Sequence, residues 1–347
     1  MTKQKIKTAI VGLGRAGWNL HLNPMIANGG FEIVAVTDPL EARCLEAVEI
    51  VPGCKIFPSL DSLLDGSDAE LVVIATPSNT HYDDAASVVR SKRHCILEKP
   101  MSANHAEALD LLRLSKECER HIFVHHVHLH RAENRHLRQI VDSGILGPLF
   151  HIRTEWAHYG RRWDWQTLRK NGGGQLANHG PHALSLVLPL LGGEVSLDHA
   201  ELRNIKDAGD AEDFVHLVLS STAGVTADLT FSSATAVGGP RWQLLGKCGS
   251  LTCDGTNSKL KTYDQALAPA LEVLDTAAPG RAYLSETLPW LEQEVPVDDG
   301  SLIIGFHENV RAVLTEGADP IVTLESACEV TRIIDLAANR APAMAEI

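Results

Sequence analysis

Two segments of the sequence contain side chains that could transfer a proton. The first, HCILEKP, is a short apolar run that ends in Glu98 and Lys99. The second, NGGGQLANHGPH, places Asn178 and His182 four residues apart behind three glycines, with His179 between them. Residues three or four apart share one face of a helix, so these side chains would point to one place. Taken alone, a surface ion pair at Lys99 and capping or packing histidines are the simpler interpretations.

A glycine-rich turn near the start of the chain favours the catalytic interpretation of these residues over the simpler ones. V-G-L-G-R-A-G places Gly12, Gly14 and Gly17 in a G-x-G-x-x-G pattern between an apolar run and a helical stretch. These glycines allow a tight turn, close approach of a diphosphate, and close packing of helix on strand. The next apolar run ends at Asp38, about 20 residues beyond Gly17, where a carboxylate can bind the ribose hydroxyls of adenosine. Together these features predict a dinucleotide site.

The predicted cofactor is NAD, because a carboxylate at position 38 would repel the 2′-phosphate of NADP. Arg43 is the nearby cation that favours NADP. The third apolar run ends in ATPSNTH, at the edge of the sheet where such folds bind ligands. The residues expected to contact the cofactor are Gly12, Gly14, Arg15, Ala16, Gly17, Asp38, Thr76, Pro77, Asn79, His81, Glu98 and Lys99.

The arrangement of apolar runs predicts an α/β protein with two domains. Over residues 1–125, KTAIVGL, FEIVAVTD, AELVVIATP, HCILEKP and RHIFVHH alternate with helical patterns, which indicates a parallel sheet of the Rossmann type. Over residues 126–347, mostly alternating strands predict an α+β domain with an open, mainly antiparallel sheet. A helical tail, from about 303 to 339 and broken at GADP, closes the chain and could pack back on the first domain.

In this arrangement, Lys99 would face the nicotinamide at the end of the fourth strand. Burial and the positive charge of an oxidised nicotinamide would lower the pKa of Lys99 toward a range useful for proton transfer. An alcohol that loses a hydride must also lose its hydroxyl proton, so a base must lie within hydrogen-bond reach. Lys99 and His182 are the catalytic candidates.

The segment EWAHYGRRWDWQ is the candidate substrate pocket, because it contains three of the six tryptophans of the chain. Aromatic faces beside charged groups suit a polyhydroxylated ring, whose C–H faces stack while its hydroxyls form hydrogen bonds. Ordinary packing of these tryptophans is the alternative. The predicted substrate is a sugar, a sugar derivative or a cyclitol, and the residues expected to bind it are Arg161, Trp163, Asp164, Asn178 and His179.

The 17 histidines raise the question of a metal site. If a strand continued through HHVHLH, then His126, His128 and His130 would lie on one side of it. Successive side chains on that side are about 7 Å apart, which is too far for three ligands around one ion. We therefore predict no metal, and expect one of these imidazoles to line the cleft between the domains.

Composition excludes several other classes of protein. The net charge of −13 disfavours nucleic-acid binding, and no run approaches the ~20 apolar residues of a membrane span. Seven cysteines without a C-x-x-C pair fit free thiols, which favours a cytoplasmic protein. An exposed face of the second sheet would favour a homodimer or a homotetramer.

The order of motifs resembles the glucose–fructose oxidoreductase, inositol dehydrogenase and rhizopine-catabolism (Gfo/Idh/MocA) family over nearly the whole chain. The resemblance rests on GLGRAG with the later Asp38, ATPSNTH, EKPMS, HRAENRHLRQIVDSGILGPL, GGGQLANHGPH, EDFVHLVLSSTAG and FHENVRAVLTEGADPIVTLESACEVTRIID. It implies a Rossmann domain, a second open sheet, and a substrate held between the two. It also implies that Lys99 belongs to the family's E-K-P signature and that His182 is its catalytic histidine.

The chain departs from the family's helix pattern G-G-G-x-L-x-D-x-G-x-H-x-x-D at two positions. Asn178 and Ser185 stand where the family commonly has aspartate. An amide can orient a hydroxyl group but cannot accept its proton as a carboxylate does. Proton transfer then rests on His182, which we favour as the base, and on Lys99 as a relay and electrostatic guide.

Three functions are compatible with this reading of the sequence. The leading one is an NAD-dependent dehydrogenase that acts on the CH–OH group of a carbohydrate-like substrate. The second is a redox-neutral enzyme that uses bound NAD to assist the cleavage of a glycoside or an epimerisation, as some relatives in this family do. The third is a non-catalytic NAD-binding regulator of the same fold.

Overall fold

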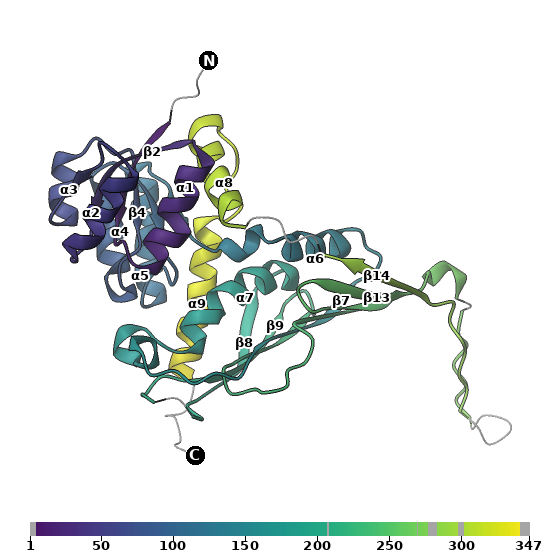
Figure 1. The fold of residues 1–347 in the computed structure, drawn as a ribbon. Coiled ribbons are helices and arrows are strands. Elements are labelled where there is room, and N and C mark those ends of the chain that lie inside the picture. The colour runs from purple at the N-terminus through teal and green to yellow at the C-terminus, as the bar shows by residue number, and fades with distance from the viewer. Residues whose placement is uncertain (1–4, 207, 269, 277–282, 298–301, 341–347) are drawn as a thin grey trace.

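The computed structural model describes residues 5–206, 208–268, 270–276, 283–297 and 302–340. It has two units, each built on its own sheet (Figure 1). The first is a six-stranded parallel sheet between helices, and the second is an eight-stranded sheet with helices on one face. The predicted α/β class, with a Rossmann-type sheet and a second open sheet, is confirmed. The domain limits of 1–125 and 126–347 stay a prediction.

The parallel sheet has the strand order β3-β2-β1-β4-β5-β6. Its strand residues are mostly buried, and alternate ones belong to separate apolar clusters on the two faces. The order reverses between β1 and β4, which is the place where such sheets bind ligands at the carboxyl ends of their strands. The strands are β1 (Ile6–Val11), β2 (Phe31–Thr37), β3 (Lys55–Ile56), β4 (Leu71–Ile74), β5 (His94–Leu97) and β6 (Ile122–Val124).

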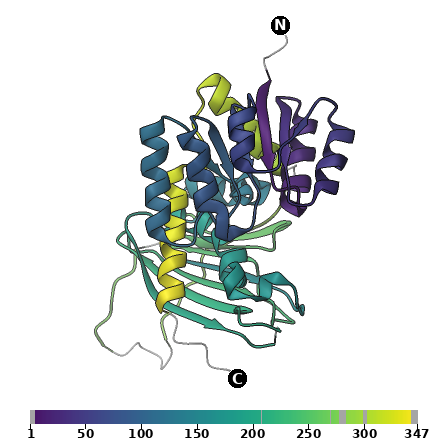
Figure 2. The ribbon, with the colours of Figure 1, turned by 90° about the vertical axis from the view of Figure 1, so that its left-hand side faces the viewer.

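Helices cover both faces of this sheet. The elements between its strands are η1 (Gly17–Leu22), α1 (Asn23–Asn28), α2 (Glu41–Ile50), α3 (Leu60–Gly66), η2 (Ser78–Thr80), α4 (His81–Arg90) and α5 (His105–Cys118). Two helices from the end of the chain, α8 (Leu302–Glu316) and α9 (Leu324–Arg340), also pack here, with α8 on one face and the start of α9 on the other. The remainder of α9 packs on the second sheet, so this helix joins the two cores (Figure 2).

The second sheet has the strand order β14-β13-β12-β11-β7-β10-β9-β8. All of its neighbours are antiparallel except β7 and β10, which are parallel. Alternate residues of its central strands are buried against the helices, as expected for a sheet with one covered face. The strands are β7 (Leu149–Ala157), β8 (Val195–Arg203), β9 (Phe214–Ser221), β10 (Thr226–Ser232), β11 (Trp242–Gly246), β12 (Gly249–Cys253), β13 (Asn257–Thr262) and β14 (Leu291–Pro296).

The remaining helices connect or cover the second sheet. The longest of them, α7, crosses its inner face and carries the segment that follows the three glycines. None of the helices in the described part of the chain is long and apolar enough to cross a membrane. These elements are η3 (Val127–His130), α6 (Ala132–Asp142), η4 (Trp165–Thr167), η5 (Arg169–Asn171), α7 (Gln175–Leu191) and η6 (Gln265–Leu267).

The condition considered for HHVHLH, a strand that continues through it, is not met in the structure. Strand β6 ends at Val124, and the chain turns into η3, where the Leu129 amide donates to the carbonyl of His126. The neighbouring strand β5 ends at Leu97, opposite Val124, so no ladder of hydrogen bonds is available to prolong β6. His126, His128 and His130 therefore do not share one side of a strand.

Candidate active site

The glycine-rich turn between β1 and η1 makes the close backbone approaches that its pattern predicts. Gly12 has a φ of +88°, and a Cβ atom there would lie 2.6 Å from the carbonyl oxygen of Ala75. A Cβ atom at Gly17 would lie 1.8 Å from the carbonyl oxygen of Gly12. A side chain at either position would therefore collide with backbone. The turn, which includes Arg15 and Ala16, fits a diphosphate that approaches the backbone.

Asp38 lies at this turn, at the end of β2. One carboxylate oxygen accepts from the amide of Leu13 at 2.7 Å, and the other accepts from the amide of Leu40 at 2.9 Å. The Asp38 side chain is 3% exposed, and Nη1 of Arg43 lies 3.3 Å from its Oδ2. The hydroxyl or phosphate of an adenosine ribose bound here would meet both the carboxylate and the guanidinium.

The turn after β4 is fixed by the buried ring of His81. Its Nδ1 lies 2.6 Å from the carbonyl oxygen of Pro100, and its Nε2 lies 3.0 Å from that of Thr76. The imidazole therefore links two turns at the carboxyl edge of the sheet. Pro77 and Asn79 lie in the same turn, at the start and within η2.

Lys99 connects the two units of the molecule. It follows β5, and its ammonium donates to the backbone carbonyl of Asn178 on α7 at 3.3 Å. Burial lowers the pKa of Lys99, and the charge of Arg15 lowers it further. The negative charge of Glu98 raises this pKa and so opposes both effects. The side chain predicted to face the nicotinamide thus reaches the helix that carries the other catalytic candidate.

Helix α7 presents His179 and His182 to one aromatic neighbourhood. The ring centroid of Trp156 lies 5.7 Å from that of His179 and 6.2 Å from that of His182. The ring of His128 lies 4.0 Å from that of His182. The Nδ1 atoms of all three histidines are buried without a hydrogen-bond partner in the described structure. Unpartnered buried nitrogens of this kind are available to a ligand.

These imidazoles are neutral at physiological pH. Burial holds the pKa of His182 well below its usual range, and the charges of His128 and Lys99 add to this effect. Burial likewise lowers the pKa of His126 to about 3 and that of His179 to about 4. A neutral imidazole can accept a proton, so the cluster offers bases beside the Lys99 ammonium.

The same buried histidines predict that the protein loses stability in mild acid. His126 and His130 are buried, and burial lowers the pKa of His130 to about 4. The unfolded chain, whose histidines titrate near 6.5, binds more protons than the folded chain as the pH falls below that value. We expect these two residues to lower the free energy of unfolding by about 2 kcal/mol between pH 6.5 and 5.5.

Urea unfolding over a series of pH values measures this slope, which should be smaller in His130→Gln. A free energy of unfolding that stays constant between pH 6.5 and 5.5 would contradict the buried, neutral state of these histidines.

Only part of the predicted substrate-binding segment lies beside His179 and His182. Trp163 is 82% exposed, and Arg161 is exposed as well. Asp164 forms an ion pair with Arg162 and accepts from the amide of Gln166 at 2.9 Å, so it caps η4. Of the three tryptophans in this segment, Trp156 packs against the ring of His182, whereas Trp163 and Trp165 are exposed.

A cavity of about 390 Å³ lies beside His179 and Trp156. The guanidinium of Arg241 stacks on the Trp156 ring at 4.3 Å from its centroid, so one face of this indole is already covered. Sequence reasoning missed Arg241, which precedes β11 without any motif. The cavity is lined by Glu155, Trp156, Ala157, His158, His179, Gly238, Gly239, Arg241 and Asp254.

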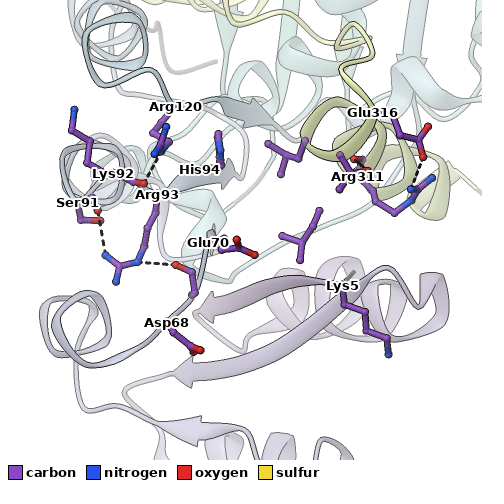
Figure 3. A pocket seen from close by; sticks show the side chains of 14 residues that line it. Lys5, Asp68, Glu70, Ser91, Lys92, Arg93, His94, Arg120, Arg311 and Glu316 are labelled. Atoms are coloured by element: carbon purple, nitrogen blue, oxygen red, sulfur yellow. Dashed lines mark hydrogen bonds and ion pairs between the residues drawn. The ribbon is translucent and has the colours of Figure 1, made fainter. Parts of the chain in front are cut away.

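A larger cavity, of about 780 Å³, lies at the opposite, amino edge of the parallel sheet (Figure 3). Its basic groups do not converge: the amino groups of Lys5 and Lys92 point in different directions. The guanidinium of Arg93 donates to backbone carbonyls, including that of Ala69 at 2.9 Å, and that of Arg120 donates to the carbonyl of Lys92. Among the described residues that line this cavity, the arginines are structural and no set of groups is aimed at one ligand.

Comparison with known families accounts for this arrangement. Residues 6–126 match the oxidoreductase family with an NAD-binding Rossmann fold (GFO/IDH/MocA), and residues 134–252 match the GFO/IDH/MocA C-terminal domain. The chain belongs to the GFO/IDH/MocA family. The resemblance seen in the sequence motifs is thereby confirmed, and the protein is an oxidoreductase.

Individual relatives differ in the chemistry that their names describe. The scyllo-inositol 2-dehydrogenase (NADP(+)) IolW of Bacillus subtilis is 23% identical over 337 residues, which are 96% of this chain and 92% of IolW. The 2,7-anhydro-N-acetylneuraminate hydratase of Escherichia coli is 25% identical over 66% of this chain and 62% of its own. The oxidoreductase YvaA of Bacillus subtilis shares the fold, with a TM-score of 0.83, 21% identity, and coverage of 97% and 96% of the two chains.

Proposed function

We propose that this GFO/IDH/MocA protein transfers hydride between NAD and a carbinol carbon of a sugar, a sugar derivative or a cyclitol. The observation that carries the proposal is the contact between Lys99, at the cofactor edge of the parallel sheet, and α7, which holds His182. NAD supplies the hydride acceptor when it is bound. The residues of the chain have to bind the substrate, orient it, and remove the hydroxyl proton.

His182 is the proposed base. Its neutral imidazole has a free, buried Nδ1 that can accept the hydroxyl proton as the hydride leaves. The Lys99 ammonium, a proton relay and electrostatic guide, donates a hydrogen bond to the same oxygen and stabilises the negative charge that develops there. In the structure, the Lys99 ammonium donates to the carbonyl of Asn178, which holds it beside the first turn of α7.

The substrate would lie between these groups and the cavity beside Trp156. The amide of Asn178 can orient a second hydroxyl group, and the unpartnered Nδ1 of His179 can form a hydrogen bond to a third. The exposed Arg161, Trp163 and Asp164 would form the outer rim of the site. The neutral donors and acceptors of Asn178 and His179 favour a polyhydroxylated substrate.

Replacing Asp38 with serine should shift the cofactor preference toward NADP. The carboxylate repels a 2′-phosphate, and its removal also releases Arg43, which now lies 3.3 Å from it, to bind that phosphate. We expect the ratio of the Kd for NADP to the Kd for NAD to fall by about tenfold, which is about 1.4 kcal/mol. Titration of the wild-type protein and of Asp38→Ser with both cofactors measures this ratio.

Asp65→Ser is a matched control, because Asp65 is an exposed carboxylate on α3. Tighter binding of NADP than of NAD by the wild-type protein would contradict the proposed preference. The measurement distinguishes this chain from its relative IolW, whose name specifies NADP(+).

A panel of sugars, sugar acids, cyclitols and glycosides, each mixed with the protein and NAD, tests the proposed reaction. The proposal predicts that at least one class yields NADH over many turnovers. A panel without NADH formation, under conditions where NAD binds, would contradict it.

A second candidate is a redox-neutral reaction in which the bound cofactor is reduced and then reoxidised. The relative named as a hydratase favours this alternative. The absorbance of reduced cofactor, followed over a single turnover, distinguishes the redox-neutral reaction from a dehydrogenase reaction. Reduced cofactor that appears and reverts without release indicates the redox-neutral route, whereas released NADH indicates a dehydrogenase.

A further inference from the structure

A buried chain of hydrogen bonds lies behind Lys99, on the parallel-sheet side of the site. Oε1 of Glu98 lies 3.0 Å from Nε2 of His21 and 2.8 Å from Nδ1 of His125. On its other side, Nδ1 of His21 lies 3.2 Å from Nε2 of His307. All four residues are buried. The chain joins η1, the ends of β5 and β6, and α8.

The Glu98 carboxylate is held in its charged form. Burial alone would raise the pKa of Glu98, but the electrostatic interactions and hydrogen bonds with His125 and His21 hold it well below its usual range. Its second oxygen accepts from the backbone amide of Lys99 at 3.2 Å. Three donors thus surround one buried carboxylate, which satisfies the requirement for partners that a buried charge imposes.

The same atoms of His21, Glu98 and His125 lie within 4.8 Å of one another, a spacing that could also surround a metal ion. Each histidine here points a nitrogen at one carboxylate oxygen at hydrogen-bond distance. Hydrogen bonding accounts for this geometry, because both nitrogens can donate N–H to Glu98. The expectation that the chain binds no metal stays a prediction.

The effect of Glu98 on the pKa of Lys99 is opposite to the effects of burial and of Arg15. The charge of Arg15 lowers the pKa of Lys99, as does burial, whereas the charge of Glu98 raises it. In the described part of the chain, four more titratable groups interact with Lys99, and all are imidazoles: His126, His128, His179 and His182. None of these neutral or cationic groups favours an ammonium, so the negative charge that favours it comes from Glu98.

We propose that Glu98 is a positioning residue for Lys99: its buried carboxylate, held by His21 and His125, favours the ammonium form and fixes the backbone from which Lys99 projects. The inference deepens the proposed function and rests on it, since it assigns the group that sets the protonation state of a candidate catalytic residue. His307 extends the arrangement to α8, because it holds the ring of His21 in the orientation that faces Glu98.

The test is competitive acetylation of the full-length protein with acetic anhydride at a series of pH values. Mass spectrometry of the Lys99 peptide gives the midpoint at which the amine becomes reactive, and the readout needs no turnover. In Glu98→Gln, the midpoint should fall by about one pH unit, because a neighbouring negative charge is removed. In Glu98→Asp, which keeps the charge but shortens the side chain, the midpoint should lie between those of Glu98→Gln and the wild type.

Asp228→Asn is the matched control. Asp228 pairs with His216 at 3.0 Å on strands β9 and β10, so this variant also removes a carboxylate from a carboxylate–histidine pair. Its Lys99 midpoint should equal that of the wild type. If Glu98→Gln does not fold, Glu98→Asp still tests the inference, since its midpoint must lie below the wild-type value.

An unchanged midpoint in both Glu98 variants would overturn the inference, as would one tightly bound metal ion per chain lost with Glu98. A shifted midpoint in a protein that forms no NADH would leave the inference standing and reject the proposed function. Where NADH is formed, the limb of the pH–rate profile assigned to Lys99 should move to lower pH in Glu98→Gln, whichever form of Lys99 is active.

Discussion

Replacing Lys99 with methionine should lower kcat by about 10³-fold while NAD still binds. Methionine keeps most of the apolar stem but removes the ammonium that donates to α7 at 3.3 Å. The oxygen that loses its proton would then lose its charged donor, and removal of one such donor costs about 10² to 10³ in rate. Loss of proton transfer through the same group adds to that effect.

Steady-state kinetics of NADH formation, with fluorescence titration of NAD, measure both quantities. Lys116→Met is the control, because Lys116 forms an exposed ion pair with Glu325 and lies on α5, outside the site. A fall in kcat of less than tenfold in Lys99→Met, with normal folding, would remove Lys99 from the mechanism.

Replacing His182 with glutamine should lower kcat by about 10²-fold or more, because an amide cannot accept the hydroxyl proton. The His182 ring is buried on α7 with Nδ1 unpartnered, and burial keeps the imidazole neutral near pH 7. The activity that remains should rise as hydroxide becomes more abundant, since hydroxide replaces the missing base.

His136→Gln is the control for this variant. His136 is a partly buried histidine on α6 whose Nε2 lies 3.0 Å from the Ser258 hydroxyl, so its replacement costs one hydrogen bond away from the site. Unchanged turnover in His182→Gln would move the base to another imidazole, and His128, 4.0 Å away between ring centroids, would be the first to test.

The parts of the site that depend on short-range spacing could be predicted from the sequence. Gly12 and Gly17 are separated by the distance that a βα turn requires, and the turn has no room for side chains at either position. The helical spacing of His179 and His182 likewise predicts a shared face, and both rings do lie against Trp156. These features follow from backbone geometry within a few residues.

The parts of the site that depend on long-range contacts could not be predicted from the sequence. His21 and His307 are 286 positions apart, and no local pattern connects them. Arg241 reaches Trp156 because β11 pairs with β7, which depends on the order of strands in the second sheet. The end of β6 before HHVHLH has the same origin. Its alternating pattern is correct for a strand, but the neighbour that would have paired with it ends at Leu97.

The most direct test of the proposed reaction is a single-turnover experiment with a substrate from the panel that carries deuterium at its carbinol carbon. Mass spectrometry of the nicotinamide then shows where the deuterium goes. Direct hydride transfer predicts one deuterium in each molecule of reduced cofactor formed, and little reduced cofactor in Lys99→Met and His182→Gln over the same time. Reduced cofactor that carries hydrogen from the solvent instead, or product formed without any reduction of the cofactor, would contradict it.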